Sequence, residues 1–237
     1  MAFYHHILLF LIIFSFTADS QELWSESCNA NIPVKKNTPL DSNINTLITQ
    51  LVSGTTKNGY IATSYGASNN QVYGLAQCRA DVTGTNCSRC IRDAADKIRQ
   101  LCPDGSIAGV LYDDCLLRYD TSKFAGRLDT SDGSYVYNVE NVTDPDSFNK
   151  KLKILTGQIS SEAVKPGNRG FGRGKIGLTK SENIYGLVQC TMDLSLASCK
   201  RCLDTAVGDL TNFCPDKKGC QVLYNSCILR YELYSFF

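Results

Sequence analysis

Cysteine is the residue type with the most chemical potential in this chain, because 12 of its 237 residues are cysteines. Five of them, between Cys78 and Cys115, recur with the same spacing 112 residues later, between Cys190 and Cys227. Each set contains a Cys-x-x-Cys pair, a spacing found in zinc sites, in redox pairs and among structural disulfides. The pair alone therefore leaves three kinds of chemistry open.

The residues between the cysteines repeat together with the cysteines. The sequence YGLAQC at 73–78 returns as YGLVQC at 185–190, and VLYDDCLLRY at 110–119 returns as VLYNSCILRY at 222–231. Two unrelated cysteine clusters would not share both spacing and flanking sequence, so the pattern indicates an internal duplication. We therefore expect two domains of one kind.

The first 20 residues are typical of a secretory signal peptide. The apolar run 7–16 has the length of an h-region and is too short to span a bilayer, and Ala18-Asp19-Ser20 is a small-x-small cleavage site. We expect a mature chain that begins at Gln21, is secreted, and is soluble because no membrane span follows. An oxidising compartment favours structural disulfides over a zinc or redox site.

Both histidines of the chain, His5 and His6, lie in this expected leader. A mature chain without histidine has no Ser-His or Cys-His catalytic pair and no histidine metal ligand. The formal net charge of +1 favours neither nucleic acid nor an acidic membrane. We expect no catalytic residue, no metal and no cofactor.

Helical and strand-like periods alternate in the first repeat. An apolar face at Ile44, Leu47, Ile48, Leu51 and Val52 predicts a helix capped by Asp41, and a second helix is predicted over 88–101. Strands are predicted beside Cys28 and at 60–65, 71–78, 107–112 and 116–119. This order predicts an α+β domain with an antiparallel sheet of about five strands and two helices packed on one face.

The second repeat predicts the same architecture. The polar segment 126–134 is expected to link a first domain at 21–125 to a second at 135–237. A strand is predicted at 135–139, and Asp144-Pro145 is expected to begin a helix. Its core face should contain Phe148, Leu152, Leu155 and Ile159. The basic glycine-rich segment 165–175 is expected to be a mobile surface loop, because a phosphate loop would lie between a strand and a helix.

The spacing C-x8-C-x2-C, followed by cysteines 12 and 13 residues further on, resembles the plant cysteine-rich domain of ginkbilobin-type antifungal proteins. Tandem copies of that domain occur in cysteine-rich repeat secretory proteins, in plasmodesmata-located proteins and in cysteine-rich receptor-like kinases. The resemblance covers essentially the whole expected mature chain. Because no kinase follows, the secretory proteins are the branch that it resembles most.

The resemblance implies a disulfide pattern for the first domain: Cys28 with Cys102, Cys78 with Cys87, and Cys90 with Cys115. The second domain has no counterpart of Cys28 and has an additional cysteine, Cys220. Cys214 then lacks its distant partner and is expected to pair with Cys220. The other expected pairs of the second domain are Cys190 with Cys199 and Cys202 with Cys227.

The resemblance also implies a mannose site built from an asparagine, an arginine and a glutamate. The matching positions in the first domain are Asn29, Gly109 and Asp120, and those in the second domain are Gln221 and Glu232. A sugar's vicinal hydroxyls suit an amide, a guanidinium and a carboxylate. Asn29, Asp120 and Glu232 are thus candidates from incomplete triads. The alternative is a local turn asparagine and two solvated carboxylates.

Two further features repeat or match a known rule. Asn141-Val-Thr143 and Asn86-Cys87-Ser88 both satisfy the glycosylation pattern, and we expect Asn141 to be the better acceptor. The Arg-Tyr pair before the end of each repeat, at 118–119 and 230–231, is interpreted as a packing tyrosine beside a surface arginine.

These observations favour a secreted, non-enzymatic recognition protein of plant defence or stress response. We expect it to act in the apoplast through protein partners, either receptor ectodomains or a second copy of itself. The alternative is a lectin-like antifungal protein that binds mannose-type cell-wall glycans. A glycan-acting enzyme with two carboxylates is a more remote hypothesis, because the sequence does not show which carboxylates meet.

Overall fold

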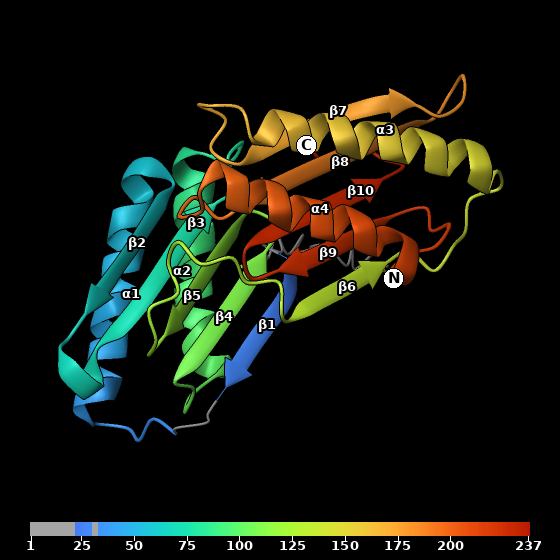
Figure 1. Ribbon diagram of the computed structural model, residues 1–237. Helices are drawn as coiled ribbons and strands as arrows, with labels where there is room; N and C mark the ends of the chain where they lie inside the picture. Colours follow the sequence, from blue (N-terminus) through green and yellow to red (C-terminus); the bar gives the residue numbers. More distant parts are fainter. Residues whose placement is uncertain (1–21, 30–32) are drawn as a thin grey trace, which may run out of the picture.

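The computed structural model describes residues 22–29 and 33–237. The expected leader, residues 1–20, lies outside the described residues. Two five-stranded antiparallel sheets, each with two long helices on one face, follow one another along the chain (Figure 1). The expected α+β class, with two tandem domains of about five strands and two helices, is confirmed.

Sheet one has the strand order β1-β4-β5-β3-β2. Its elements are β1 (Leu23–Asn29), α1 (Pro39–Asn58), β2 (Tyr60–Tyr65), the short 3-10 helix η1 (Ser68–Asn70), β3 (Val72–Cys78), α2 (Gly84–Leu101), β4 (Ile107–Tyr112) and β5 (Cys115–Asp120). The first strand of the chain, β1, therefore pairs with β4 and forms one edge of the open sheet. That edge borders the second domain (Figure 1).

Sheet two repeats the order as β6-β9-β10-β8-β7. Its elements are β6 (Gly133–Tyr137), α3 (Pro145–Ala163), β7 (Phe171–Gly177), β8 (Asn183–Cys190), α4 (Leu196–Phe213), β9 (Cys220–Tyr224) and β10 (Cys227–Glu232). β6 begins at Gly133, within the segment expected to be a linker. The duplication in the sequence is thus a duplication of topology.

The predicted helix faces form the cores. Ile44, Leu47 and Leu51 of α1 are fully buried, and Phe148, Leu155 and Ile159 of α3 are at most 3% exposed. In each domain the helices pack on the sheet face that carries the tyrosine of the Arg-Tyr pair, Tyr119 or Tyr231. Successive side chains of a strand alternate between faces, so the neighbouring arginines project from the helix-free face.

Six disulfides connect these elements. They are Cys28–Cys102, Cys78–Cys87, Cys90–Cys115, Cys190–Cys199, Cys202–Cys227 and Cys214–Cys220, and no described cysteine is free. Four of them join the start of α2 or α4 to the strands beneath. The remaining two differ in reach: Cys28–Cys102 encloses a sequence separation of 74, and Cys214–Cys220 one of 6.

Two local predictions were wrong. Thr38, and not Asp41, is the N-cap of α1: its hydroxyl accepts the backbone N–H of Asp41 at 3.3 Å. Asp41 lies in the first turn, where its carboxylate is bound by Arg99. The segment expected to be a mobile loop contains most of β7, which pairs with β8 over its whole length.

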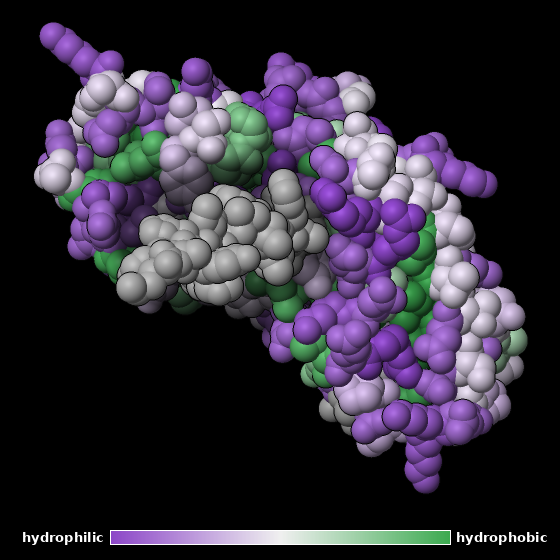
Figure 2. All heavy atoms as spheres, turned by 180° about the vertical axis from the view of Figure 1, so that it is seen from behind, coloured by the Kyte–Doolittle hydropathy of each residue, from purple (hydrophilic) through white to green (hydrophobic). Residues whose placement is uncertain are grey.

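The molecule is elongated, and on the described part of the face seen from behind hydrophilic side chains are widespread, with smaller hydrophobic patches between them (Figure 2). The helix-free faces of the two sheets meet near its middle. Leu75, Leu187 and Leu223 project from these faces and are at most 4% exposed, although none belongs to either helix-covered core. Contact between the two sheets therefore buries apolar surface of its own.

Candidate functional site

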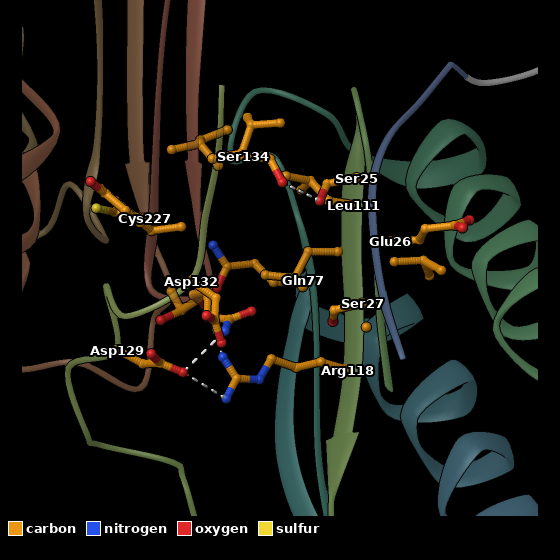
Figure 3. A pocket seen from close by; sticks show the side chains of 18 of the residues that line it. Ser25, Glu26, Ser27, Gln77, Leu111, Arg118, Asp129, Asp132, Ser134 and Cys227 are labelled. Carbon is orange, nitrogen blue, oxygen red and sulfur yellow. Dashed lines mark hydrogen bonds and ion pairs between the residues drawn. The ribbon is translucent and has the colours of Figure 1, made fainter. Parts of the chain in front are cut away.

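A cavity of about 800 Å³ lies between the two sheets. Its walls come from β1, β3, β4 and β5 of sheet one, from the segment 129–132, and from β6, β8, β9 and β10 of sheet two. Hydroxyl, amide, guanidinium and carboxylate groups project into it, among them Ser27, Gln77 and Arg118 (Figure 3). A concave site with several polar groups at a domain interface is the usual form of a ligand site.

A buried glutamine of sheet one fixes the position of sheet two. The side-chain amide of Gln77 donates to the carbonyl oxygen of Cys190 at 3.0 Å, and its oxygen accepts the backbone N–H of Met192 at 2.8 Å. Gln77 is 4% exposed, so both of its contacts are protected from water. Gln77, which precedes a cysteine present in both repeats, therefore forms its side-chain hydrogen bonds with the other domain and not within its own.

The equivalent glutamine of sheet two returns the same contacts. The amide of Gln189 donates to the carbonyl oxygen of Cys78 at 3.5 Å and accepts the backbone N–H of Ala80 at 3.0 Å. Gln189 stands 112 residues after Gln77, so the two domains are related by an approximate two-fold axis between these side chains. The cavity is consequently a fixed feature of the tandem.

The arginines of the two Arg-Tyr pairs also cross the interface. Arg118 donates to the carbonyl oxygen of Asn225 at 3.1 Å, and Arg230 lies 3.4 Å from the carboxylate of Asp113. Asn225 is the equivalent of Asp113, so these contacts obey the same approximate symmetry. Arg230 is 7% exposed. The interpretation of surface arginines was therefore wrong, because each arginine reaches into the opposite domain and their side chains are only 12% (Arg118) and 8% (Arg230) exposed.

One wall of the cavity is the connecting segment. Asp129 accepts a hydrogen bond from the side chain of Asn225 at 3.0 Å and lies 3.8 Å from Arg118. Burial opposes ionisation of Asp129, but hydrogen bonds from Ser131 and Asn225 outweigh it and hold the pKa of this carboxyl below its usual range. Ser25 and Ser134 close another side through a 3.2 Å contact between their hydroxyls (Figure 3).

The first-domain positions implied for sugar binding line this cavity. Asn29 pairs with Ile107, and Gly109 pairs with both Ser27 and Arg118. By strand alternation Asn29, Gly109 and Asp120 share the helix-free face of sheet one. Asp120 is half-buried and accepts the backbone N–H of Ser122 at 2.7 Å.

The position of the implied arginine is Gly109, and it leaves little space for a side chain. A Cβ atom at Gly109 would lie 2.9 Å from the hydroxyl of Ser27 and 3.5 Å from the Cβ of Arg118. The cavity does contain a guanidinium, but it belongs to Arg118 on the neighbouring strand. That guanidinium already donates to Asn225 of the other domain. The site therefore combines the amide of Asn29 and the carboxylate of Asp120 with a guanidinium that also holds the domain interface.

Glu232 lies apart from this cavity. It is 7% exposed and lies 3.2 Å from the Nε of Arg230. Burial raises the pKa of Glu232 above its usual range, although the Arg230 guanidinium opposes the shift. The interpretation as a solvated carboxylate does not fit this burial. The structure thus separates Glu232 from Asn29 and Asp120.

The strand register reveals a further position that sequence reasoning missed. Cys28 pairs with Ala108 in sheet one, and Tyr137 pairs with Cys220 in sheet two. Cys220 is the equivalent of Ala108, so Asn138, the residue after Tyr137, occupies the place of Asn29. The search for a cysteine followed by asparagine could not find it, because tyrosine replaces the cysteine. Asn138, Gln221 and Glu232 therefore occupy the triad positions of the second domain.

The two glycosylation patterns have different surroundings. Asn141 and Thr143 are exposed in the connection before α3. Asn86 is exposed in the first turn of α2, where its side chain accepts a 3.1 Å hydrogen bond from Arg89. The central residue of that second pattern, Cys87, is buried and bonded to Cys78.

Among residues 22–29 and 33–237, none of the helices has the length and apolar character needed to cross a bilayer. Within the same residues, no group of three or more His, Cys, Asp or Glu side chains could hold a metal ion.

A family model with the description "Salt stress response/antifungal" matches residues 27–122 and 136–234. The chain is 46% identical to cysteine-rich repeat secretory protein 55 of Arabidopsis thaliana, over 98% of this chain and 88% of that protein. It is 40% identical to an antimicrobial ginkbilobin-2-like protein of Castanea crenata, over 82% of this chain and 80% of that protein. The expected resemblance is confirmed by these matches.

Two solved structures share the tandem fold. One is the tandem DUF26 ectodomain of the Arabidopsis thaliana cysteine-rich receptor-like protein PDLP8, with 28% identity and a TM-score of 0.82 over 91% of this chain and 100% of that chain. The other is the corresponding ectodomain of PDLP5, with 24% identity and a TM-score of 0.76 over 90% of this chain and 100% of that chain.

Proposed function

The chain belongs to the salt stress response/antifungal family of tandem cysteine-rich domains, and from this premise we propose that it is an extracellular recognition protein of plant defence or stress. In this proposal it acts in the apoplast without catalysis, and its partners are proteins, foremost the ectodomains of receptor-like kinases. Relatives named secretory proteins support the location.

The rigid junction between the two domains is the observation that carries this proposal. Gln77 and Gln189 are both buried, and the side chain of each binds the backbone of the residue that follows the other. The two sheets therefore present one fixed surface. A receptor-like ectodomain matches the same tandem over all of its own length. A fixed composite surface lowers the entropy cost of binding a large partner, and this favours protein recognition.

The experiment is an interferometry panel with the oxidised mature chain on the sensor. Ectodomains of cysteine-rich receptor-like kinases are one arm, and kinase ectodomains without these domains are the other. We expect saturable binding in the first arm alone. A folded chain that binds neither arm, shown intact by its six disulfides, would contradict the proposal.

A second candidate function is binding of a mannose-type glycan, as a lectin-like antifungal protein. The observation in its favour is that Asn29 and Asp120 share one face of sheet one and line a polar cavity. The cavity has the size of a small-ligand site, and its hydroxyl, amide and carboxylate groups suit sugar hydroxyls.

A further inference from the structure

β6 is an edge strand with one unpaired side. Among the described strands it pairs with β9 alone, at the lower border of sheet two (Figure 1). β1 of sheet one approaches its start through the contact between the Ser25 and Ser134 hydroxyls. The backbone N–H of Asn138 donates to Gly219 at 2.9 Å, which directs the hydrogen-bonding groups of Asn138 toward β9. Because these groups alternate along a strand, those of Tyr135 and Tyr137 point outward, away from the sheet.

Large apolar side chains are exposed along this edge. Nine large apolar side chains are exposed among the described residues, and four of them gather here: Val136 at 44%, Tyr137 at 50%, Val139 at 84% and Phe213 at 45%. The ring of Phe213 stacks on Tyr135 with 3.8 Å between centroids. Such a concentration on one edge marks an interaction surface.

The protections usual for a free edge are missing from β6. Proteins blunt edge strands with charged side chains, proline or bulges, because unpaired strand groups recruit other chains. The other edge of the same sheet, β7, carries Arg173 and Lys175, whereas 133–139 contains no charged residue and no proline. The β6 edge therefore has the backbone groups and the apolar side chains that an added strand requires.

Charge at the two ends of β6 gives the added strand a direction. Asp132 precedes the strand and is exposed, while the ammonium group of Lys217 lies 5.5 Å from the ring centroid of Tyr137 at its far end. An antiparallel segment would bring its first residues to Lys217 and its last residues to Asp132. It would match the edge if it began with acidic residues and ended with basic ones.

We propose that the β6 edge binds an extended segment of a partner protein as an additional antiparallel strand. The segment has an acidic beginning, an uncharged centre of β-branched or aromatic residues, and a basic end. Main-chain hydrogen bonds to Tyr135 and Tyr137 supply affinity, and the charged ends supply direction. This inference rests on the proposed recognition of proteins and assigns one surface to it.

The test uses the mature chain and two short synthetic peptides, both with the centre Val-Thr-Val-Thr-Val. One begins with two glutamates and ends with two lysines, and the other has these charges exchanged. Fluorescence anisotropy at low salt should show about fivefold tighter binding of the first peptide, from two exposed ion pairs. Equal affinities, or no binding of either peptide, would overturn the proposal.

Tyr137→Pro is the variant that isolates the edge. Proline removes the outward N–H of residue 137 and leaves the inward bond of Asn138 to Gly219, a position that an edge strand tolerates. It should lose peptide binding about tenfold or more, whereas Tyr137→Thr, which keeps the N–H, should retain it. Unchanged binding by a folded Tyr137→Pro variant would overturn the assignment of this edge.

A charge-exchange variant tests the proposal independently if the proline variant fails to fold. Asp132→Lys combined with Lys217→Glu should reverse the preference between the two peptides, and an unchanged preference would contradict the proposed direction. Concentration-dependent dimers that Tyr137→Pro abolishes would make a second copy of the chain the occupant and overturn the partner segment. Kinase ectodomains that bind Tyr137→Pro normally would support the proposed function while rejecting this surface.

Discussion

Asn29 and Asp120 lie on one face of sheet one, but the residue between them in the sheet decides what they can hold. Gly109 contributes no side-chain donor there, and the guanidinium of Arg118 on the neighbouring strand is bound to Asn225 of the other domain. A sugar in this cavity would be held by Asn29, Asp120 and nearby serine hydroxyls. The cavity therefore suits a weakly bound hydroxyl-rich ligand more than a tightly bound one.

The glycan candidate predicts a specific effect of Asn29. On an array of cell-wall glycans, Asn29→Ala should reduce binding to mannose-type sugars about fivefold, because one hydrogen-bonding amide contributes on the order of 1 kcal/mol. Asn45→Ala is the matched control, since Asn45 is exposed on α1, away from the cavity. Equal loss in both variants, or a blank array from folded protein, would reject sugar binding at Asn29.

Gly109→Arg is the complementary gain of function. The new Cβ atom would meet the rotatable hydroxyl of Ser27 at 2.9 Å, which a change of the serine rotamer can relieve. It would restore the arginine of the implied triad beside Asn29 and Asp120. We expect the variant to bind mannose-type glycans more tightly than the parent chain, and unchanged or weaker binding by the folded variant would contradict a mannose site of the implied kind in this cavity.

At the scale of elements, the sequence predicts what depends on periodicity and on cysteine spacing. The apolar faces of α1 and α3 and the limits of β2 and β4 follow from local pattern, and the structure confirms them. The register of β6 does not follow, because no cysteine marks it, and so Asn138 was missed. The inter-sheet cavity was not predictable either, since periodicity records which face is apolar but not which other sheet covers it.

The two unequal disulfides give a prediction for the edge strands. Cys28–Cys102 ties β1 to the end of α2 across a separation of 74, whereas Cys214–Cys220 closes a separation of 6 and leaves β6 without a covalent tie. By chain entropy, replacing the first pair with serines should cost about 2 kcal/mol more than replacing the second. Urea unfolding of the two double variants without reductant measures the difference. Equal costs would mean that packing holds β1.

At the scale of the molecule, the interface between the domains has the reciprocal character of a symmetric dimer. Gln77 and Gln189 exchange contacts, and Arg118 and Arg230 reach equivalent turns of the opposite domain. In an isologous interface the same surface patch is used on both sides of a two-fold axis, so equivalent residues make equivalent contacts. The repeat in the sequence predicted two domains, but only the structure shows that the repeated glutamine joins them.

This reciprocity predicts that the two glutamines are energetically coupled. Gln77→Ala removes the donor to Cys190 and the acceptor of Met192, so each single alanine variant should cost about 1–3 kcal/mol for buried groups left unpaired. Once one replacement has loosened the junction, the second should cost less than it does alone. Calorimetry of the singles and the double measures the cycle, with Gln50→Ala on the surface of α1 as control. Strictly additive losses would mean that the glutamines act independently. A double variant that melts in two separate steps would show that this pair makes the two domains unfold as one unit.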